Sequence, residues 1–267
     1  MNLDTLTFYG IVLKEVLYND NDKILTVLTA NKGIISVTAK GVKSIKSKNS
    51  SAVQLFCYSE FEILKYKNQY VLKSANLKDG FYGIRDDVEK YALACYFAEI
   101  TAFFATSEND ETDVLRLLLN ALYVVAKDEN KPLWLTKAAF ELKLACVCGF
   151  APQFEYCKSC GTALGAIHSK HVFFSFAENE IICEDCVSKN GDNYGENLKK
   201  LSVSASFAIQ YVINSQINRF ATFKLDGINA SAFCEFCEKY LIYTAERSFE
   251  SLKFYYSIKK QLLKDQK

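Results

Sequence analysis

Four cysteines form two pairs with the spacing of metal ligands. Cys157 and Cys160 make one C-x2-C pair, and Cys183 and Cys186 make a second pair after 22 intervening residues. Each pair predicts a turn on which two sulfurs converge, and two such turns supply four thiolates in the tetrahedral arrangement that Zn²⁺ prefers. Four thiolates fill the coordination sphere and leave no position for water or substrate. The spacing therefore predicts one structural zinc ion and no catalytic metal.

Other interpretations of the cysteines stay open. The four thiols are alternatively unrelated reduced side chains, or a redox dithiol, although neither pair has the strand-to-helix setting of a thioredoxin-like motif. His168 and His171 lie between the pairs, and either would replace one cysteine as a ligand in a mixed site. Two further cysteine pairs indicate core packing, with a weak accessory metal site as the alternative for the second: Cys234 with Cys237, and Cys146 with Cys148.

A lysine-rich stretch near the start of the chain is the second feature that could carry a chemical function. Residues 23–59 contain six lysines and no aspartate or glutamate: Lys23, Lys32, Lys40, Lys43, Lys46 and Lys48. The stretch 40–51 is rich in lysine and serine, so it has the charges and the flexibility to follow a phosphate backbone, with neighbouring Tyr and Phe rings to stack on bases. We interpret these six lysines as a nucleic-acid-binding set. A solvated loop kept soluble by lysine is the alternative.

Motifs that carry catalysis are missing from the sequence. There is no Walker A loop, no G-x-G-x-x-G, no G-x-S-x-G and no H-E-x-x-H. Asp20 and Asp22 are a pair of carboxylates, but a turn between strands explains them better. We therefore expect that the protein is not an enzyme. The rival hypothesis is a metal-dependent hydrolase whose zinc shell is completed by His168 or His171.

Composition narrows the class of protein. The chain has 267 residues, half of them hydrophobic, which predicts one to three packed units and excludes disorder of the whole chain. The net charge of +1 gives no global attraction to a polyanion, so a nucleic-acid site must be local. No leader-like start and no long apolar run is seen, which predicts a cytoplasmic protein without a membrane partner, with its ten cysteines reduced.

The pattern of hydrophobic residues changes along the chain. Short β-branched and aromatic runs separated by turn residues predict five strands of a small antiparallel barrel, over 8–18, 24–29, 33–39, 53–66 and 70–74. This pattern does not separate an oligonucleotide-binding barrel from another five-stranded barrel. Helical spacing follows from Asp86, and a further helix runs from Pro132 to Gly149. Residues 151–190 lose periodicity, and helices resume over 198–218 and 230–263.

Several short segments, in order, resemble the RecO family of bacterial recombination mediators. The resemblance rests on residues 10–14, 18–25, 29–43, 140–144, 149–152, 157–161, 174–175, 182–186 and 251–253. It implies an α+β fold with an oligonucleotide-binding (OB) barrel over 1–80 and an α-helical domain over 81–267 that contains a zinc-finger-like element at 151–190. It also implies a recombination mediator near the nucleoid that binds single- and double-stranded DNA and anneals strands.

The same resemblance implies protein partners. These are RecR, the tail of single-strand-binding protein and, indirectly, RecA, which such proteins help to load. The chain departs from the family in having Asn179 to Ile182 where a Gly-Gly pair is common, and lysine where arginine is common. Lysine keeps the charge and loses the bidentate fork, which predicts more salt-sensitive binding. The alternative function is a zinc-ribbon transcription factor or RNA-binding factor.

Overall fold

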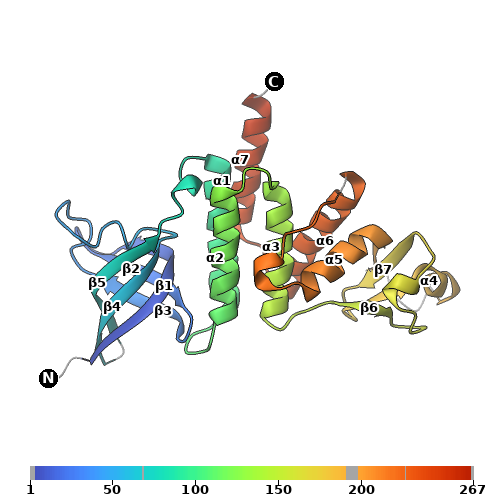
Figure 1. Cartoon of the computed structure of the whole chain (residues 1–267), viewed down its shortest axis with the longest axis horizontal. Helices are drawn as coiled ribbons and strands as arrows, with labels where there is room; N and C mark the ends of the chain where they lie inside the picture. Colours follow the sequence, from blue (N-terminus) through green and yellow to red (C-terminus); the bar gives the residue numbers. More distant parts are fainter. Residues whose placement is uncertain (1–3, 68, 191–197, 226, 266–267) are drawn as a thin grey trace. The chain divides into compact units, whose positions relative to one another are not determined.

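The structure is a computed structural model that describes residues 4–67, 69–190, 198–225 and 227–265 (Figure 1). By its internal contacts the chain divides into two compact units. The first unit combines residues 1–129 with 249–267, and the second unit contains residues 130–248. The first unit is therefore built from both ends of the chain.

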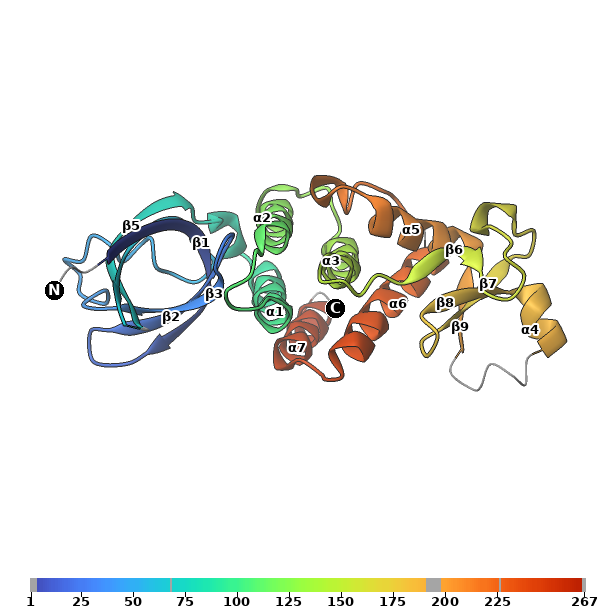
Figure 2. The same cartoon turned by 90° about the horizontal axis from the view of Figure 1, so that it is seen from below.

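Five strands of the first unit close into a barrel in the order β1-β2-β3-β5-β4, which confirms the predicted fold class. They are β1 (Asp4–Leu17), β2 (Lys23–Thr29), β3 (Gly33–Ala39), β4 (Tyr58–Tyr66) and β5 (Gln69–Asp79). Figure 2 looks into the ring that they form. One pairing departs from the expected antiparallel pattern, because β3 and β5 run parallel at Val37 and Thr38. The chain crosses the barrel between β3 and β4, so β5 returns in the direction of β3.

Residues 40–57 form this crossing as a series of turns, whereas the hydrophobic pattern predicted that the fourth strand starts at Val53. Val42 and Val53 are buried in the barrel core, so the segment packs against the barrel through these two side chains. Phe56 has a φ of 66°, a left-handed conformation that interrupts an extended chain. For this reason the strand begins only at Tyr58.

Three helices complete the first unit: α1 (Val88–Phe104), α2 (Thr112–Lys127) and α7 (Glu250–Asp265), with a short 3-10 turn, η1 (Tyr82–Ile84). The Asp87 side chain accepts hydrogen bonds from the Glu89 and Lys90 amides and so caps the start of α1. Helix α7 packs along α1, and the Tyr255 hydroxyl donates to Glu89 at 3.2 Å.

The second unit contains three helices and a four-stranded sheet. The helices are α3 (Leu133–Val147), α5 (Val203–Asn214) and α6 (Gly227–Ala245), with a short 3-10 turn, η4 (Ile217–Arg219), and two of the helices, α5 and α6, contact the sheet. The sheet has the order β6-β8-β7-β9, from β6 (Gln153–Cys157), β7 (His171–Ser175), β8 (Glu180–Cys183) and β9 (Leu198–Ser202), accompanied by η2 (Leu164–Ala166) and α4 (Glu184–Asn190). Phe154 and Phe174 stack at 5.2 Å between ring centroids, and both contact Phe236 of α6 edge-on. These rings fix the sheet on the helix.

The expectation of a helix over 198–218 was wrong at its start. Residues 198–202 pair with β7 as an edge strand, with Leu201 opposite Val172. The helix begins only after Ser202, whose side chain accepts a hydrogen bond from the Ala205 amide. Hydrogen bonding to a sheet edge therefore overrides the helical pattern of these five residues.

Charged side chains of α3 are buried and hold this unit together. The Lys143 ammonium donates to the carbonyls of Val212, Ile213 and Ser215 at 3.1, 2.9 and 2.6 Å, and so caps the C-terminal end of α5. Lys137 lies 2.7 Å from Glu141 on its own helix. Among the described residues, no helix combines the length and the apolar character that crossing a membrane requires.

Candidate metal centre and nucleic-acid interface

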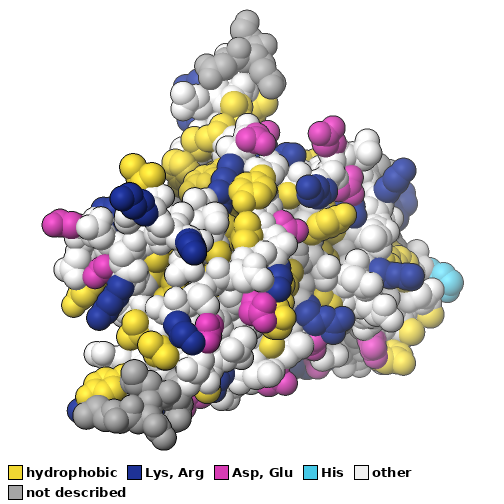
Figure 3. All heavy atoms as spheres, turned by 60° about the vertical axis from the view of Figure 1, so that its left-hand side comes forward, with side chains coloured by type: hydrophobic (Ala, Val, Ile, Leu, Met, Phe, Trp, Pro, Cys, Tyr) yellow, Lys and Arg dark blue, Asp and Glu magenta, His cyan; other side chains and the backbone are white. Residues whose placement is uncertain are grey.

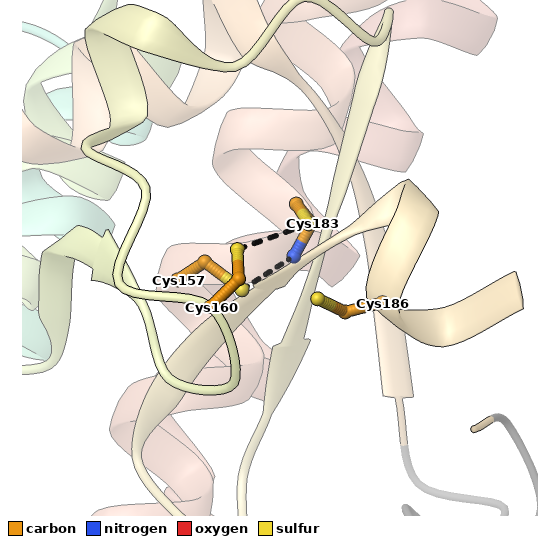
Figure 4. A group of neighbouring side chains, drawn as sticks. All are labelled: Cys157, Cys160, Cys183 and Cys186. Carbon is orange, nitrogen blue, oxygen red and sulfur yellow. Dashed lines mark hydrogen bonds between the residues drawn. The ribbon is translucent and has the colours of Figure 1, made fainter. Parts of the chain in front are cut away.

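The second unit brings the four predicted cysteines together (Figure 4). Cys157 ends β6 and Cys160 follows in a turn, where Gly161 takes a φ of 70° that favours glycine. Cys183 ends β8, and Cys186 lies in the first turn of α4. Backbone hydrogen bonds close the first turn, with the Gly161 amide donating to the Cys157 carbonyl at 2.8 Å. Two neighbouring strand ends therefore present two sulfurs each.

The sulfur positions fit a tetrahedral metal site. All four Sγ atoms lie within 4.8 Å of one another, and the Cys160 and Cys183 sulfurs are 3.8 Å apart. Zn–S bonds of about 2.3 Å place the sulfurs of a tetrahedron about 3.8 Å apart. The Cys183 amide also donates to the Cys157 sulfur at 3.3 Å, which ties the two cysteine pairs together. The four cysteines can thus hold a metal ion through an all-sulfur donor set.

Titration of the thiols is uneven across the cluster. Hydrogen bonds from Thr162, by its hydroxyl and its backbone, lower the pKa of the Cys160 thiol to about 6. Burial raises the pKa of Cys183, and burial together with the neighbouring cysteines raises that of Cys186. A divalent cation would favour all four thiolates at once.

Neither histidine joins this group. In the part of the chain that the structure describes, the cluster of candidate ligands contains the four cysteines only. His171 instead lies 3.8 Å from Glu184, and His168 is exposed beside the hollow at the cluster. This arrangement favours a closed four-thiolate site over a mixed site.

The remaining predicted cysteine pairs lie apart from the cluster. Cys237 is fully buried in α6, and burial raises the pKa of its thiol, as expected of a core side chain. Cys234, Cys146 and Cys148 are partly buried, and none of them belongs to a group of three candidate ligands among the described residues.

The predicted DNA-binding lysines fall into three places on the barrel. Lys40, Lys43, Lys46 and Lys48 are all exposed on the crossing between β3 and β4. We call residues 40–48 the lysine segment. Figure 3 shows the barrel side of the molecule, where lysine and arginine side chains stand among hydrophobic and acidic ones and form no continuous basic field. On this face the positive charge is therefore scattered and not gathered in one broad patch.

The β1–β2 turn holds the lysine segment in place. The Asp22 carboxylate accepts a hydrogen bond from the Gly41 amide at 2.8 Å, and the Lys43 amide donates to the Asn21 carbonyl at 3.2 Å. The Gly41 bond, followed by the Asn19 side chain, lowers the pKa of Asp22. Tyr18, in the same turn, is 62% exposed. Four cations and an aromatic ring thus share one end of the barrel.

Lys23 and Lys32 are placed differently. Lys23 pairs in register with Ala39, so it lies near the lysine segment, but its ammonium is 2.8 Å from Glu15. Lys32 sits in the β2–β3 turn at the other end of strands that span about 20 Å. There its carbonyl accepts from the Glu108 amide at 3.0 Å. The structure does not bring Lys32 together with the other five.

One contact of the lysine segment was not expected from the sequence. Asp22 is more than a turn residue, because its carboxylate accepts the hydrogen bond of the Gly41 amide. The sequence offers one signal for this contact. Residues 19–22 are all Asn or Asp, and side chains of these types commonly accept hydrogen bonds from nearby backbone amides.

The fold and the site define a class of protein: a small closed barrel with a cationic segment at one end, followed by helices that carry a four-cysteine knuckle. The family model described as "Recombination protein O N terminal" matches residues 1–81, and that described as "Recombination protein O C terminal" matches residues 85–253. The chain therefore belongs to the RecO family, which supports a role in DNA repair by recombination.

Curated relatives of the chain are described as DNA repair proteins of this family. The chain is 29% identical over 245 residues to the "DNA repair protein RecO" of Acetivibrio thermocellus, which covers 92% of this chain and 94% of that protein. It is 35% identical over 181 residues to the "DNA repair protein RecO" of Caldicellulosiruptor bescii, covering 68% and 72%. The chain is 25% identical over 245 residues to the "DNA repair protein RecO" of Desulforamulus reducens, which covers 92% of this chain and 91% of that protein.

Proposed function

We propose that the chain is a recombination mediator that binds single- and double-stranded DNA without sequence preference and anneals complementary strands. We further propose that it acts with RecR to load RecA onto DNA covered by single-strand-binding protein, whose tail it binds, and that it works at the nucleoid in the cytoplasm. Family membership supports the general role. The observation that carries the DNA-binding part is the attachment of the lysine segment to the β1–β2 turn at one end of the barrel.

The mechanism follows from charge and geometry. Lys40, Lys43, Lys46 and Lys48 neutralise phosphates without contacting base edges, so binding is indifferent to sequence. Neutralised strands repel each other less, which lets complementary bases pair. Tyr18 offers a ring face on which a base can stack. No covalent bond is made or broken, and we propose that the protein is not an enzyme.

The cysteine cluster has a supporting role in this proposal. Cys157, Cys160, Cys183 and Cys186 would hold one zinc ion, and four sulfur ligands leave it no open position. When bound, the ion would cross-link the ends of β6 and β8, two strands of five and four residues. The zinc therefore stabilises the second unit and takes no part in binding DNA.

Salt-dependent binding tests the proposal. Fluorescence anisotropy of a labelled single-stranded oligonucleotide is measured at several salt concentrations, for the wild type and for the variant with Lys40, Lys43, Lys46 and Lys48 all changed to Ala. Each phosphate contact on a single strand contributes about −0.7 to the slope of log K against log salt. We expect the variant to flatten the slope by about 3 and to lose strand annealing.

A matched control removes the same charge elsewhere. Lys127, Lys170, Lys224 and Lys260 are exposed and lie outside the lysine segment, so their combined change to Ala should leave the slope as it is. Equal effects of the two variants would refute the assignment. Oligonucleotides of different base sequence and an RNA of the same length separate the proposal from a transcription or RNA-binding factor, which would discriminate between them.

A further inference from the structure

Ile45 is the most exposed large hydrophobic residue of the described chain. Its relative exposure is 104%, and it lies in the middle of the lysine segment. Moving an aliphatic side chain out of water lowers the free energy, so this isoleucine would be stabilised by burial against a partner that the neighbouring lysines attract.

The local backbone holds this side chain outward. The Ser44 amide donates to the Gly41 carbonyl at 3.3 Å, and the Ser47 amide donates to the Ser44 carbonyl at 2.9 Å. Val42, at the start of these two consecutive turns, is buried in the barrel core, whereas Ile45, three residues later, is fully exposed to solvent. Since Gly41 is itself bound to Asp22, the turn is anchored at its base. Ile45 is therefore the tip of an anchored turn.

The surroundings of Ile45 define the chemistry of its partner. Exposed lysines stand on both sides, Lys43 before it and Lys46 and Lys48 after it. The isoleucine side chain between lysines is complementary to a partner that has negative charges on its outside and apolar groups between them. A nucleic acid has this composition, because its phosphates lie outside and its bases present flat apolar faces. Proteins that bind the minor groove of duplex DNA use the same combination, with Arg or Lys contacts beside an Ile, Leu or Phe that is inserted between base steps.

We propose that Ile45 is a wedge that inserts between adjacent bases of bound DNA while the flanking lysines neutralise the phosphates. This inference rests on the proposed DNA binding and adds a mode of contact to it. A lipid surface is less well matched, because membrane attachment scales with buried apolar area and one isoleucine supplies little. By separating neighbouring bases, the wedge keeps a single strand from stacking on itself, which leaves its bases free to pair.

Base unstacking gives a direct test. An oligonucleotide with 2-aminopurine in a purine run is titrated with wild type, with Ile45→Ser and with Ile228→Ser. Ile228 is a matched control, since it is 88% exposed but lies in α6 of the second unit. We expect the wild type and Ile228→Ser to raise 2-aminopurine fluorescence about twofold or more, and Ile45→Ser to abolish the rise. We also expect Ile45→Ser to lower affinity about tenfold with an unchanged salt slope.

A second measurement places the side chain itself. The chain has a single tryptophan, so Trp134→Phe gives a background without tryptophan fluorescence. On that background, Ile45→Trp should be quenched by the oligonucleotide, and Ile228→Trp should not. Vesicles rich in phosphatidylglycerol serve as the competing partner.

The outcomes separate the wedge from the proposed function. If the wild type binds no DNA, both are wrong. If the wild type binds with the expected salt slope, but the residue at position 45 is not quenched and Ile45→Ser unstacks bases normally, the wedge is wrong and DNA binding stands. A response of Ile45→Trp to vesicles and not to DNA would assign the tip to a lipid surface and overturn the wedge.

Discussion

At the scale of single residues, Asp22 decides where the lysine segment lies. Its carboxylate accepts from the Gly41 amide, and that bond, together with the Asn19 side chain, lowers its pKa below the usual 3.8. A depressed pKa means that the ionised form stabilises the folded state. The contribution is present above pH 3.8 and is lost as the pH falls through the lower folded value.

The titration of Asp22 is therefore predicted to be visible at Gly41. The amide proton shift of Gly41 should titrate with a midpoint below 3.8, as measured by NMR between pH 2 and 6. Asp22→Asn should remove this titration, whereas Asp20→Asn, in the same turn, should leave it in place. A midpoint at or above the usual aspartate value would contradict the role given to Asp22.

At the scale of elements, the cysteine cluster joins the ends of β6 and β8 to the start of α4. We predict one zinc ion per chain in protein purified without chelator, measured by elemental analysis. Cys157→Ser should lose the metal and lower the melting temperature of the second unit, because structural metal binding contributes directly to folding free energy. Its DNA affinity should stay within about twofold of the wild type, since the lysine segment lies in the other unit.

Cys95→Ser is the control for this prediction, because Cys95 lies on α1, outside the cluster. It should retain the metal. Cobalt substitution gives a further check, since four thiolates and a mixed histidine site have different absorption spectra. A mixed-site spectrum, or a wild type without metal, would contradict the four-thiolate assignment.

At the scale of the whole molecule, the C-terminal helix belongs to the unit that contains the N-terminal barrel. Tyr255 of α7 is 1% exposed, and Phe249 packs edge-on to Tyr96 and Phe103 of α1. We predict that Tyr255→Ala destabilises the first unit by about 3–5 kcal/mol, because it leaves a cavity against α1. Hydrogen exchange should then show lost protection in α1, more than 150 residues earlier in the chain.

The neighbouring Tyr256 is the matched control, since it is 43% exposed. Tyr256→Ala should cost less than about 1 kcal/mol. If both variants loosen α1 equally, or if Tyr255→Ala loosens only the second unit, α7 does not complete the first unit as described.

The sequence by itself determined the features that depend on short-range chemistry. Cys157 and Cys160 are close enough in the chain to form a knuckle wherever the segment lies, and their residue type specifies the metal class. The alternating pattern of the first 80 residues specified strands of a barrel. The cap at Asp87 is likewise local, because its side chain accepts from backbone amides two and three residues away.

Only the tertiary structure decided how distant segments combine. The length of β2 and β3 separates Lys32 from Lys40, although both belong to one charge pattern. A free edge of β7 recruits residues 198–202 as a strand, and α7 returns to α1. Lys143 is buried because the carbonyl groups at the end of α5 satisfy its ammonium. In each case the free energy comes from partners far away in the chain, which a local pattern does not contain.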